Sequence, residues 1–469
     1  MRSIGGHMYN TLFRSVIFPV MEQYSHTTIQ NYYAELQQSQ WLPAEEITEL
    51  QNKKLRHLVE HAYAHVPYYR RIFKQRNVLP GDIKSVDDLP KLPLLTKDII
   101  RENFQDLTAS NLTKNAMLNH TSGSTGQPLR YYITKDGISI SWATGYRGWG
   151  WGGYAWGDKR ATLGFWRDYD SAATSASRNI SLLKRIRFTL ERNLPLSTLN
   201  MTEEVLESYV SQISAYNPKI LRGYPSAISI LAHYIEDHNV KTIQPKAVFT
   251  TAETLLPHQK RKIEEIFQCP TFNHYGCRDG AANAMECEEH SGLHIASEQC
   301  YIEVINPKER ADPGGLGEII STDLHNYAMP FIRYRTGDCG ILSDKKCPCG
   351  RGLPLLQSIE GRIINMVVHS DGSYLAGLPL TDVFEHLEQQ KNDTIRHYQV
   401  IQETKEYLVI KIVKGKNYRQ ENDQKIIAEM KKHLGEPVVV SLEYVDDIPT
   451  TQSGKRNYVI SHIPKETIP

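Results

Sequence analysis

The chain has 469 residues, of which 40% are hydrophobic and 23% are charged, and its formal net charge is +1. This length exceeds what one hydrophobic core organises and indicates two or more domains. The balanced charge, without a long basic run, argues against a nucleic-acid partner, and no apolar stretch approaches the ~20 residues that span a bilayer. We therefore expect a globular protein with neither nucleic acid nor membrane as a partner.

The first part of the chain predicts helices. Residues 1–23 favour an amphipathic helix over a signal peptide, because they lack a long apolar core and a small-residue cleavage site. Helical periodicity then runs over residues 27–75, with a break at Pro67. Thr96 is the expected N-cap of a short helix that begins near Lys97.

The remainder of the chain divides into two patterns. From about residue 115 to 305, short apolar strands alternate with helical segments, which predicts an α/β architecture with a largely parallel sheet. From about residue 396, two strands, a helix and a last strand predict a small α+β unit. We place the boundary after Gly361, giving a large N-terminal α/β domain at 1–361 and a small C-terminal α+β domain at 362–469.

The sharpest local signal is TSGSTG at residues 121–126. Glycines and small hydroxylated residues let a backbone approach a polyphosphate and form an anion-binding nest, although a flexible surface turn has the same composition. The absence of a following GKS or GKT excludes a Walker A loop. The predicted phosphate-binding residues are Ser122, Gly123, Ser124, Thr125 and Gly126.

A series of motifs in a fixed order resembles the adenylate-forming (acyl-AMP) ligase superfamily. After the phosphate loop come TTAE at 250–253, NHYGCRDG at 273–280, FIRYRTGD at 331–338, EGR at 360–362 and PTTQSGKRNYV at 449–459. RGYPSA at 222–227 and CPCGRGLPLLQSIEGR at 347–362 are similar to the phenylacetate–CoA ligase branch and its CapK-like members. The resemblance implies the fold of the adenylate-forming ligases, ATP and Mg²⁺ as cofactors, and a small carboxylic acid as substrate.

The resemblance also implies which residues bind the nucleotide. Asp338 would accept hydrogen bonds from the ribose hydroxyls, Arg362 would contact the ribose and phosphate side, and Tyr275 would offer its ring to adenine, with a plain core role as the alternative. The nucleotide-binding residues outside the phosphate loop are then Ala252, Glu253, Asn273, His274, Tyr275, Gly276, Asp338 and Arg362.

Three residues carry the predicted chemistry of adenylation. Lys455, in PTTQSGK, would neutralise both the carboxylate and the α-phosphate, and Thr125 is expected to assist from the phosphate loop. Asp279 stands where relatives usually carry Glu and is the expected Mg²⁺ ligand. Arg278 departs from the family pattern and leaves open a pairing with Asp279 or a contact with phosphate.

The seven cysteines, an odd number without an export signal, argue against a disulfide framework and predict a cytoplasmic protein. Three of them fit a structural zinc site, since thiolates with one imidazole form closed tetrahedral Cys₃His centres. The resemblance favours His294 over His290 as the fourth ligand, because GLH recurs in the zinc-bearing members of the CapK-like branch. The predicted ligands are Cys287, His294, Cys347 and Cys349.

The acid and the acyl acceptor stay open at this stage. The aromatic cluster at 146–158, which includes Trp149, Trp151, Tyr154 and Trp156, suits either a pocket wall or core. Ile363 and Ile364 replace the acidic residues that CoA ligases usually carry after the hinge arginine, which favours an amine or hydroxyl acceptor over CoA. A CoA ligase and an inactive nucleotide-binding homologue are the alternatives.

Overall fold

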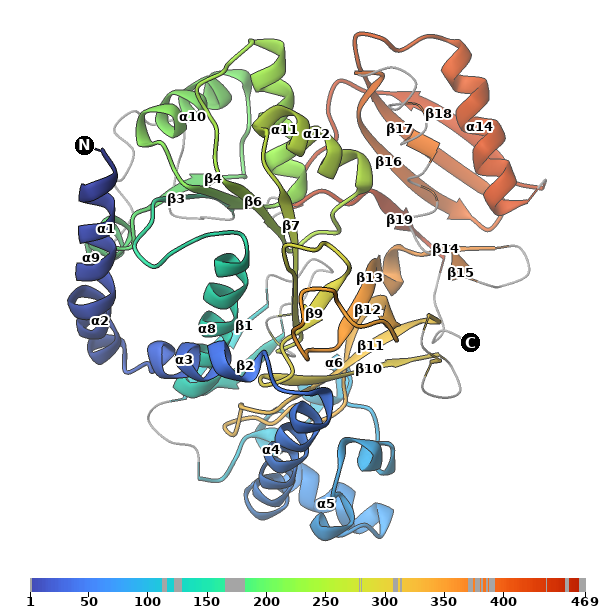
Figure 1. Ribbon diagram of the computed structural model, residues 1–469. Helices are drawn as coiled ribbons and strands as arrows, with labels where there is room; N and C mark the ends of the chain where they lie inside the picture. The colour runs from blue at the N-terminus through green and yellow to red at the C-terminus, as the bar shows by residue number, and fades with distance from the viewer. Residues whose placement is uncertain are drawn as a thin grey trace.

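The computed structural model describes residues 2–111, 116–121, 129–164, 182–277, 279, 281–306, 311–312, 314–369, 374–375, 380, 383–384, 387, 393–435, 437–451 and 455–463. Among these residues, no helix is both long enough and apolar enough to cross a membrane. The described chain forms a large N-terminal domain built on one extended sheet and a small C-terminal domain with its own sheet (Figure 1). The predicted fold class is confirmed.

The N-terminal region is helical, as the sequence predicts. Pro67 begins a new helix directly after the one that ends at His65, and the Thr96 hydroxyl accepts a hydrogen bond from the Ile99 N–H at 3.2 Å, which confirms the predicted cap. The elements are α1 (Arg2–Leu12), η1 (Phe13–Ile17), α2 (Phe18–Ser25), α3 (Ile29–Ser39), α4 (Ala44–His65), α5 (Pro67–Arg76), η2 (Pro80–Asp82), η3 (Val86–Lys91), α6 (Lys97–Glu102) and α7 (Phe104–Leu107).

The large sheet has eleven strands within the described residues, in the order β10-β11-β12-β13-β9-β8-β7-β6-β5-β3-β4. The five strands β3 to β7 are parallel to one another, and the pairing becomes antiparallel from β7 onward. The strands are β3 (Arg160–Gly164), β4 (Asn193–Ser197), β5 (Ile220–Gly223), β6 (Ala247–Thr251), β7 (Thr271–Gly276), β8 (Asn283–Glu286), β9 (Leu293–Ile295), β10 (Cys300–Ile305), β11 (Leu316–Asp323), β12 (Tyr334–Ser343) and β13 (Leu355–Arg362).

Helices cover both faces of the parallel strands because apolar side chains alternate between the faces. In β6, Val248 packs among the helices α10 to α12, whereas Phe249 packs on the opposite face against α8 and the N-terminal helices. The helices are α8 (Lys135–Trp151), α9 (Leu182–Leu190), α10 (Glu203–Tyr216), α11 (Pro225–Asp237) and α12 (Pro257–Phe267), and a separate hairpin pairs β1 (Met117–His120) with β2 (Arg130–Ile133).

The small domain has a four-stranded sheet in the order β18-β17-β16-β19, with one long helix packed on it. The two strands, helix and last strand that the sequence predicts are therefore present. The predicted boundary between residues 361 and 362 stays a prediction. The elements after it are η4 (Ile363–Asn365), β14 (Val367–Val368), β15 (Tyr374–Leu375), β16 (Ile395–Thr404), β17 (Tyr407–Lys414), α14 (Glu421–Leu434), β18 (Val439–Tyr444) and β19 (Val459–Ser461).

The aromatic cluster of residues 146–158 belongs mainly to the core. Trp149, Tyr154 and Trp156 are buried, with 2%, 5% and 6% of their surface exposed. They pack with the N-terminal helices on the α8 face of the sheet. Their density therefore builds the core that holds α1 to α3 in place, which is the second of the two roles open from the sequence.

A buried ion pair ties α8 to the antiparallel half of the sheet. The Arg147 Nη1 lies 2.7 Å from the Glu298 Oε1, and the two side chains are 2% and 3% exposed. The exposed pair of Arg101 and Asp98 has the same 2.7 Å separation. Because an unpaired buried charge is costly whereas an exposed pair contributes little, burial should decide the effect of removing each arginine.

We expect Arg147→Ala to lower the free energy of unfolding by about 3–5 kcal/mol and Arg101→Ala to lower it by less than about 1 kcal/mol. Urea unfolding followed by tryptophan fluorescence measures the free energy of unfolding of the large domain, because all six tryptophans precede residue 167. Equal effects of the two substitutions would contradict the assignment of a stabilising buried pair.

Candidate functional site

The carboxyl ends of the parallel strands gather most of the predicted nucleotide-binding residues that the structure describes. Ala252 and Glu253 directly follow β6, and the run from Asn273 to Gly276 ends β7. Ala252 has a left-handed backbone with φ of 70°, so the chain turns sharply after β6. In open α/β sheets, ligands bind beyond these carboxyl ends, which makes this edge the candidate nucleotide site.

The predicted phosphate-loop residues, Ser122, Gly123, Ser124, Thr125 and Gly126, lie outside the described residues, as does Arg278. The described residues on either side of the loop belong to or adjoin the β1–β2 hairpin. There the Thr121 N–H donates to the Leu129 carbonyl at 2.9 Å. Thr121 and Leu129, the described residues on either side of this stretch, are thus held next to each other.

Tyr275, Asp338 and Arg362 meet in one polar group. The Tyr275 hydroxyl donates to the Asp338 Oδ2 at 3.0 Å, and the Arg362 Nε lies 3.4 Å from the Asp338 Oδ1. Asp338 and Arg362 are direct partners in the β12–β13 register. Burial, and next the charge of Asp338, raise the pKa of Tyr275 well above its ordinary value, so the phenol is a proton donor. The structure therefore brings together three predicted residues from distant parts of the sequence.

Asp279 sits in a different environment from the one the magnesium prediction assumes. Its Oδ2 accepts a hydrogen bond from the Tyr334 hydroxyl at 2.6 Å, and its Oδ1 accepts one from the Cys277 thiol at 3.0 Å. The residue is 8% exposed. Both oxygens are thus engaged within the protein, and this arrangement does not fit a metal ligand without a change of partners. The catalytic and magnesium roles of Asp279 stay predictions.

Asn273 and His274 are held by the neighbouring strand β8. The Asn273 N–H donates to the Glu286 Oε2 at 2.8 Å, and the His274 Nε2 lies 3.0 Å from the Asn283 Oδ1. Burial, followed by the nearby Arg222, lowers the pKa of His274 to about 3, so the ring is neutral. His274 points to the opposite face of the strand from Tyr275, toward α8, and its role in nucleotide binding stays a prediction.

Lys455 lies at the same sheet edge although it belongs to the small domain. Its Nζ is 5.6 Å from the centre of the Tyr224 ring, just after β5. The adjoining Arg456 N–H donates to the Glu253 Oε1 at 2.9 Å, while the Ser226 N–H donates to the Glu253 Oε2 at 3.1 Å. Burial raises the pKa of Glu253, and these hydrogen bonds and the charge of Lys455 oppose that rise. The predicted catalytic lysine is therefore docked at the candidate nucleotide site.

Glu253 links the two domains. The sequence predicts it among the nucleotide-binding residues, and that role stays a prediction. Its two oxygens accept backbone hydrogen bonds, one from each domain. Tyr224 lies within the RGYPSA motif and Arg456 directly follows SGK, and those motifs were their sequence signal. The ion pairs of Asp237 with Arg396, at 2.8 Å, and with Lys416 had no such signal. They form a second contact between the domains.

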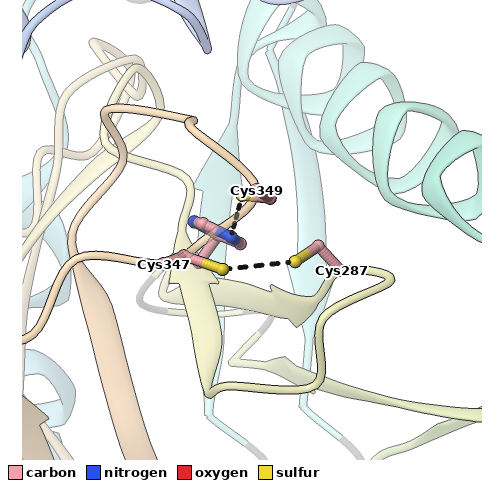
Figure 2. Close-up of side chains that lie close together, drawn as sticks. Cys287, Cys347 and Cys349 are labelled. Atoms are coloured by element: carbon pink, nitrogen blue, oxygen red, sulfur yellow. Dashed lines mark hydrogen bonds between the residues drawn. The ribbon is translucent and has the colours of Figure 1, made fainter.

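The four predicted zinc ligands converge on one point. Cys287 and Cys347 face each other with their sulfurs 3.6 Å apart (Figure 2). The Cys349 Sγ lies 3.4 Å from the His294 Nε2, and all four ligand atoms lie within 4.8 Å of one another. Tetrahedral zinc with Zn–S near 2.3 Å and Zn–N near 2.0 Å requires ligand separations of about 3.5–3.8 Å. The donor set and its spacing therefore fit zinc.

The geometry favours His294 over His290 as the fourth ligand. The Nδ1 of His294 lies 3.4 Å from the Leu353 carbonyl, so the opposite ring nitrogen faces the sulfurs. Burial lowers the pKa of His294 to about 4, which keeps the imidazole neutral. His290 instead lies 3.2 Å from Glu286, with its Nδ1 also 3.4 Å from the Lys260 Nζ.

Comparisons with known proteins concern first the fold and then the sequence. The structure superposes on 2-hydroxyisobutyryl-CoA ligase in the postadenylation state in complex with 2-HIB-AMP, with a TM-score of 0.74, 19% identity, and coverage of 90% of this chain and 91% of that one. The fold is therefore that of the adenylate-forming ligases. Residues 367–462 match the CapK C-terminal domain.

The chain is also similar in sequence to CapK and to phenylacetate–CoA ligases. It is 25% identical to protein CapK of Staphylococcus aureus over 450 residues, covering 92% of this chain and 93% of CapK. It is also 25% identical to the phenylacetate-coenzyme A ligase of Thermus thermophilus, over 70% of this chain and 73% of the relative. Its homologues are thus CapK and the phenylacetate–CoA ligases, which confirms the predicted resemblance.

The cluster of three cysteines and His294 predicts that the protein binds zinc. We expect the purified protein to contain about one zinc ion per chain, measured by elemental mass spectrometry. His294→Ala should lose the metal and lower the melting temperature, because an open site cannot hold zinc in a closed tetrahedron. The matched variant His290→Ala should keep it. Full zinc content in His294→Ala, or loss in both variants, would contradict the ligand assignment.

Proposed function

We propose that this chain is an AMP-forming ligase that uses ATP to activate a carboxylic acid as an acyl-adenylate, releases pyrophosphate, and transfers the acyl group to an amine or hydroxyl acceptor. The observation that carries the proposal is the position of Lys455. It lies beside Tyr224 at the sheet edge where the predicted nucleotide-binding residues gather. The homology to CapK and the phenylacetate–CoA ligases supports the same reaction class.

The chemistry follows from charge. The attacking carboxylate and the α-phosphate are both anionic, so the reaction depends on neutralising charge and aligning the reactants. Lys455 supplies a mobile cation, and its backbone is anchored by Thr451, whose hydroxyl accepts the Lys455 N–H at 3.2 Å. Mg²⁺ bound with ATP would neutralise further phosphate charge. Lys455 then serves to hold the carboxylate at the phosphorus and to stabilise the charge that develops there.

The Tyr275, Asp338 and Arg362 group suits the nucleoside. Asp338 offers carboxylate oxygens to two ribose hydroxyls once its present partners give way. Arg362 lies at the last position of β13. It is beside the carboxylate of Asp338 and at the start of the small domain. In this proposal, Asp338 binds ribose and Arg362 links nucleotide binding to the position of the small domain.

The acceptor is proposed from where the chain differs from CoA ligases. Its match to CapK covers 92% of its length, whereas the match to the Thermus phenylacetate–CoA ligase covers 70%. Ile363 and Ile364 follow Arg362 in place of acidic residues. The absence of these acidic residues supports an amine or hydroxyl acceptor, while the phenylacetate–CoA ligase relatives favour CoA as the second candidate. An inactive homologue is disfavoured because Lys455 and Asp338 are retained.

Product analysis distinguishes the acceptors. The purified protein is incubated with ATP, Mg²⁺ and an acid that supports turnover, together with either CoA or a panel of amines and hydroxyl compounds. Mass spectrometry of the products should show an amide or ester. Efficient formation of acyl-CoA without any amide or ester would overturn the acceptor proposal and leave adenylation intact.

Removing the predicted catalytic cation tests the chemistry. We expect Lys455→Ala to reduce acid-dependent pyrophosphate release by about 10²–10³-fold, the usual effect of losing one group that stabilises transition-state charge. Lys405→Ala, at the exposed turn between β16 and β17, is the matched control and should keep the wild-type rate. An active Lys455→Ala protein would show that the lysine assignment is wrong.

We expect that disrupting the contact at Asp237, which lies outside the nucleotide site, slows pyrophosphate release less than removing Lys455 does. Asp237 ends α11, and its pairs with Arg396 and Lys416 hold the small domain against the large one. The TM-score to 2-hydroxyisobutyryl-CoA ligase is 0.74 for the postadenylation state but 0.60 for the thioesterification state. The domains of this chain are thus arranged more like the postadenylation state.

Asp237→Asn should therefore slow pyrophosphate release about three- to tenfold, since partly exposed pairs contribute up to about 1 kcal/mol each. The loss should be in kcat, because Asp237 lies outside the nucleotide site, and added salt should shrink the difference from wild type. Glu429→Gln removes a pair within α14 and serves as the control. An unchanged kcat in Asp237→Asn would contradict the role of this contact.

A further inference from the structure

A small cavity lies between the two domains and is lined by three histidines. It has a volume of about 160 Å³ and lies where α11 and α12 of the large domain face β16 of the small domain (Figure 1). His233 belongs to α11, His258 to the first turn of α12, and His397 to β16. His397 therefore reaches the other two histidines only through the docking of the small domain.

The cavity is connected to the segment that carries Lys455. Tyr458, three residues after Lys455, forms part of the cavity wall. The Gln259 Nε2 of α12 donates a hydrogen bond to the Tyr458 hydroxyl at 2.6 Å. A change in the packing around the cavity would therefore move the segment that brings Lys455 to the candidate nucleotide site.

Two of the three histidines are held in the neutral form. The Nδ1 of His258 has no hydrogen-bond partner among the described residues, and the His258 ring lies 5.9 Å from the Tyr398 ring of the small domain. Burial, followed by the charge of Arg261, lowers the pKa of His258 to about 3. Burial, followed by the charge of Arg456, lowers the pKa of His397 well below its ordinary value. Both rings are thus uncharged while the domains are docked.

The acidic groups around the cavity already have cationic partners. Lys262 lies 3.1 Å from Glu236 and 3.7 Å from Glu265, and Arg396 lies 2.8 Å from Asp237 and 3.1 Å from Asp393. The other titratable groups that the structure describes around the cavity are His233, Arg261, Tyr398, Arg456 and Tyr458. In this part of the chain, a proton added to either neutral histidine would therefore join cations instead of gaining a free carboxylate.

We propose that His258 and His397 make the docking of the small domain depend on pH, so that acid weakens the arrangement that places Lys455 at the sheet edge. A histidine in water has a pKa of about 6.5, and undocking exposes both rings to water. The docked arrangement thus binds fewer protons than the undocked one. Docking is favoured above about pH 6.5 and is lost as the pH falls below that value. The domain movement stands by itself, whereas its effect on pyrophosphate release rests on the proposed function.

The carboxylates at the domain contacts do not produce this response. Burial raises the pKa of Glu253, so Glu253 would favour docking as the pH falls. At Asp237 the effect of burial is outweighed by Lys416 and Arg396, which hold the pKa of Asp237 below its ordinary value. This contact therefore keeps its charges between about pH 7.5 and 5.5. A loss of docking within that range points to the histidines.

Energy transfer between fluorescent labels at Glu204 of α10 and Gln424 of α14, both exposed, measures the domain arrangement without substrate. From about pH 7.5 to 5.5, the ratio of undocked to docked protein should rise on the order of 100-fold, about tenfold for each histidine. His258→Gln with His397→Gln removes both titrating rings and supplies neutral amides, so the rise should be less than about tenfold. His462→Gln, at a histidine of the small domain whose side chain is 54% exposed, should respond like wild type.

Two further measurements keep the test decisive. All six tryptophans precede residue 167, so unchanged tryptophan emission shows that the large domain stays folded in acid. Asp237→Asn weakens docking and brings the response into the measurable range if the wild type stays docked throughout. Energy transfer that is independent of pH in both proteins would overturn the proposal, as would an unaltered response in the double histidine variant. Absence of pyrophosphate release at every pH, with pH-dependent transfer intact, would contradict the proposed function alone.

Discussion

The carboxylate of Glu253 is the contact on which the arrangement of the site depends. It is placed by the turn that follows β6, and its two oxygens accept N–H groups from Ser226 in the large domain and Arg456 in the small domain. A buried carboxylate with two such donors is held firmly, since breaking either contact leaves a desolvated charge short of a partner. Lys455 is adjacent to Arg456, so the same contact determines where its ammonium group can reach.

The antiparallel half of the sheet supplies the other part of the site. The cluster of Cys287, His294, Cys347 and Cys349 lies at the opposite end of β13 from that part. Cys347 and Cys349 precede β13, and His294 of β9 pairs directly with Leu355 at the start of that strand. At its far end, β13 carries Arg362 opposite Asp338. A metal that closes the cluster would hold β9 to β13 and so stabilise the strand that presents Arg362. Such a metal would have a structural role, at a distance from the reacting groups.

Local signals in the sequence predicted what local chemistry determines. Pro67 and Thr96 act within one turn of chain, and the alternation of strands and helices follows from faces that must be buried, so these predictions hold. The resemblance predicted Tyr275, Asp338 and Arg362 as nucleotide-binding residues, and the three meet although they are far apart in the chain. The second contact between the domains left no comparable trace. Asp237, Arg396 and Lys416 are common surface residues whose pairing depends on how two folded domains meet. The hydrogen bond of Asp279 to Tyr334 likewise depends on strand packing that spacing does not reveal.

We propose that the docked lysine and the nucleotide-binding residues together adenylate an acid without help from CoA. Acid-dependent exchange of labelled pyrophosphate into ATP measures that half-reaction alone, in a mixture that contains no CoA. We expect exchange with at least one acid from a panel of aromatic, hydroxy and amino acids, and none when the acid is omitted. ATP binding without exchange for any acid of the panel, or exchange that occurs only when CoA is added, would contradict it.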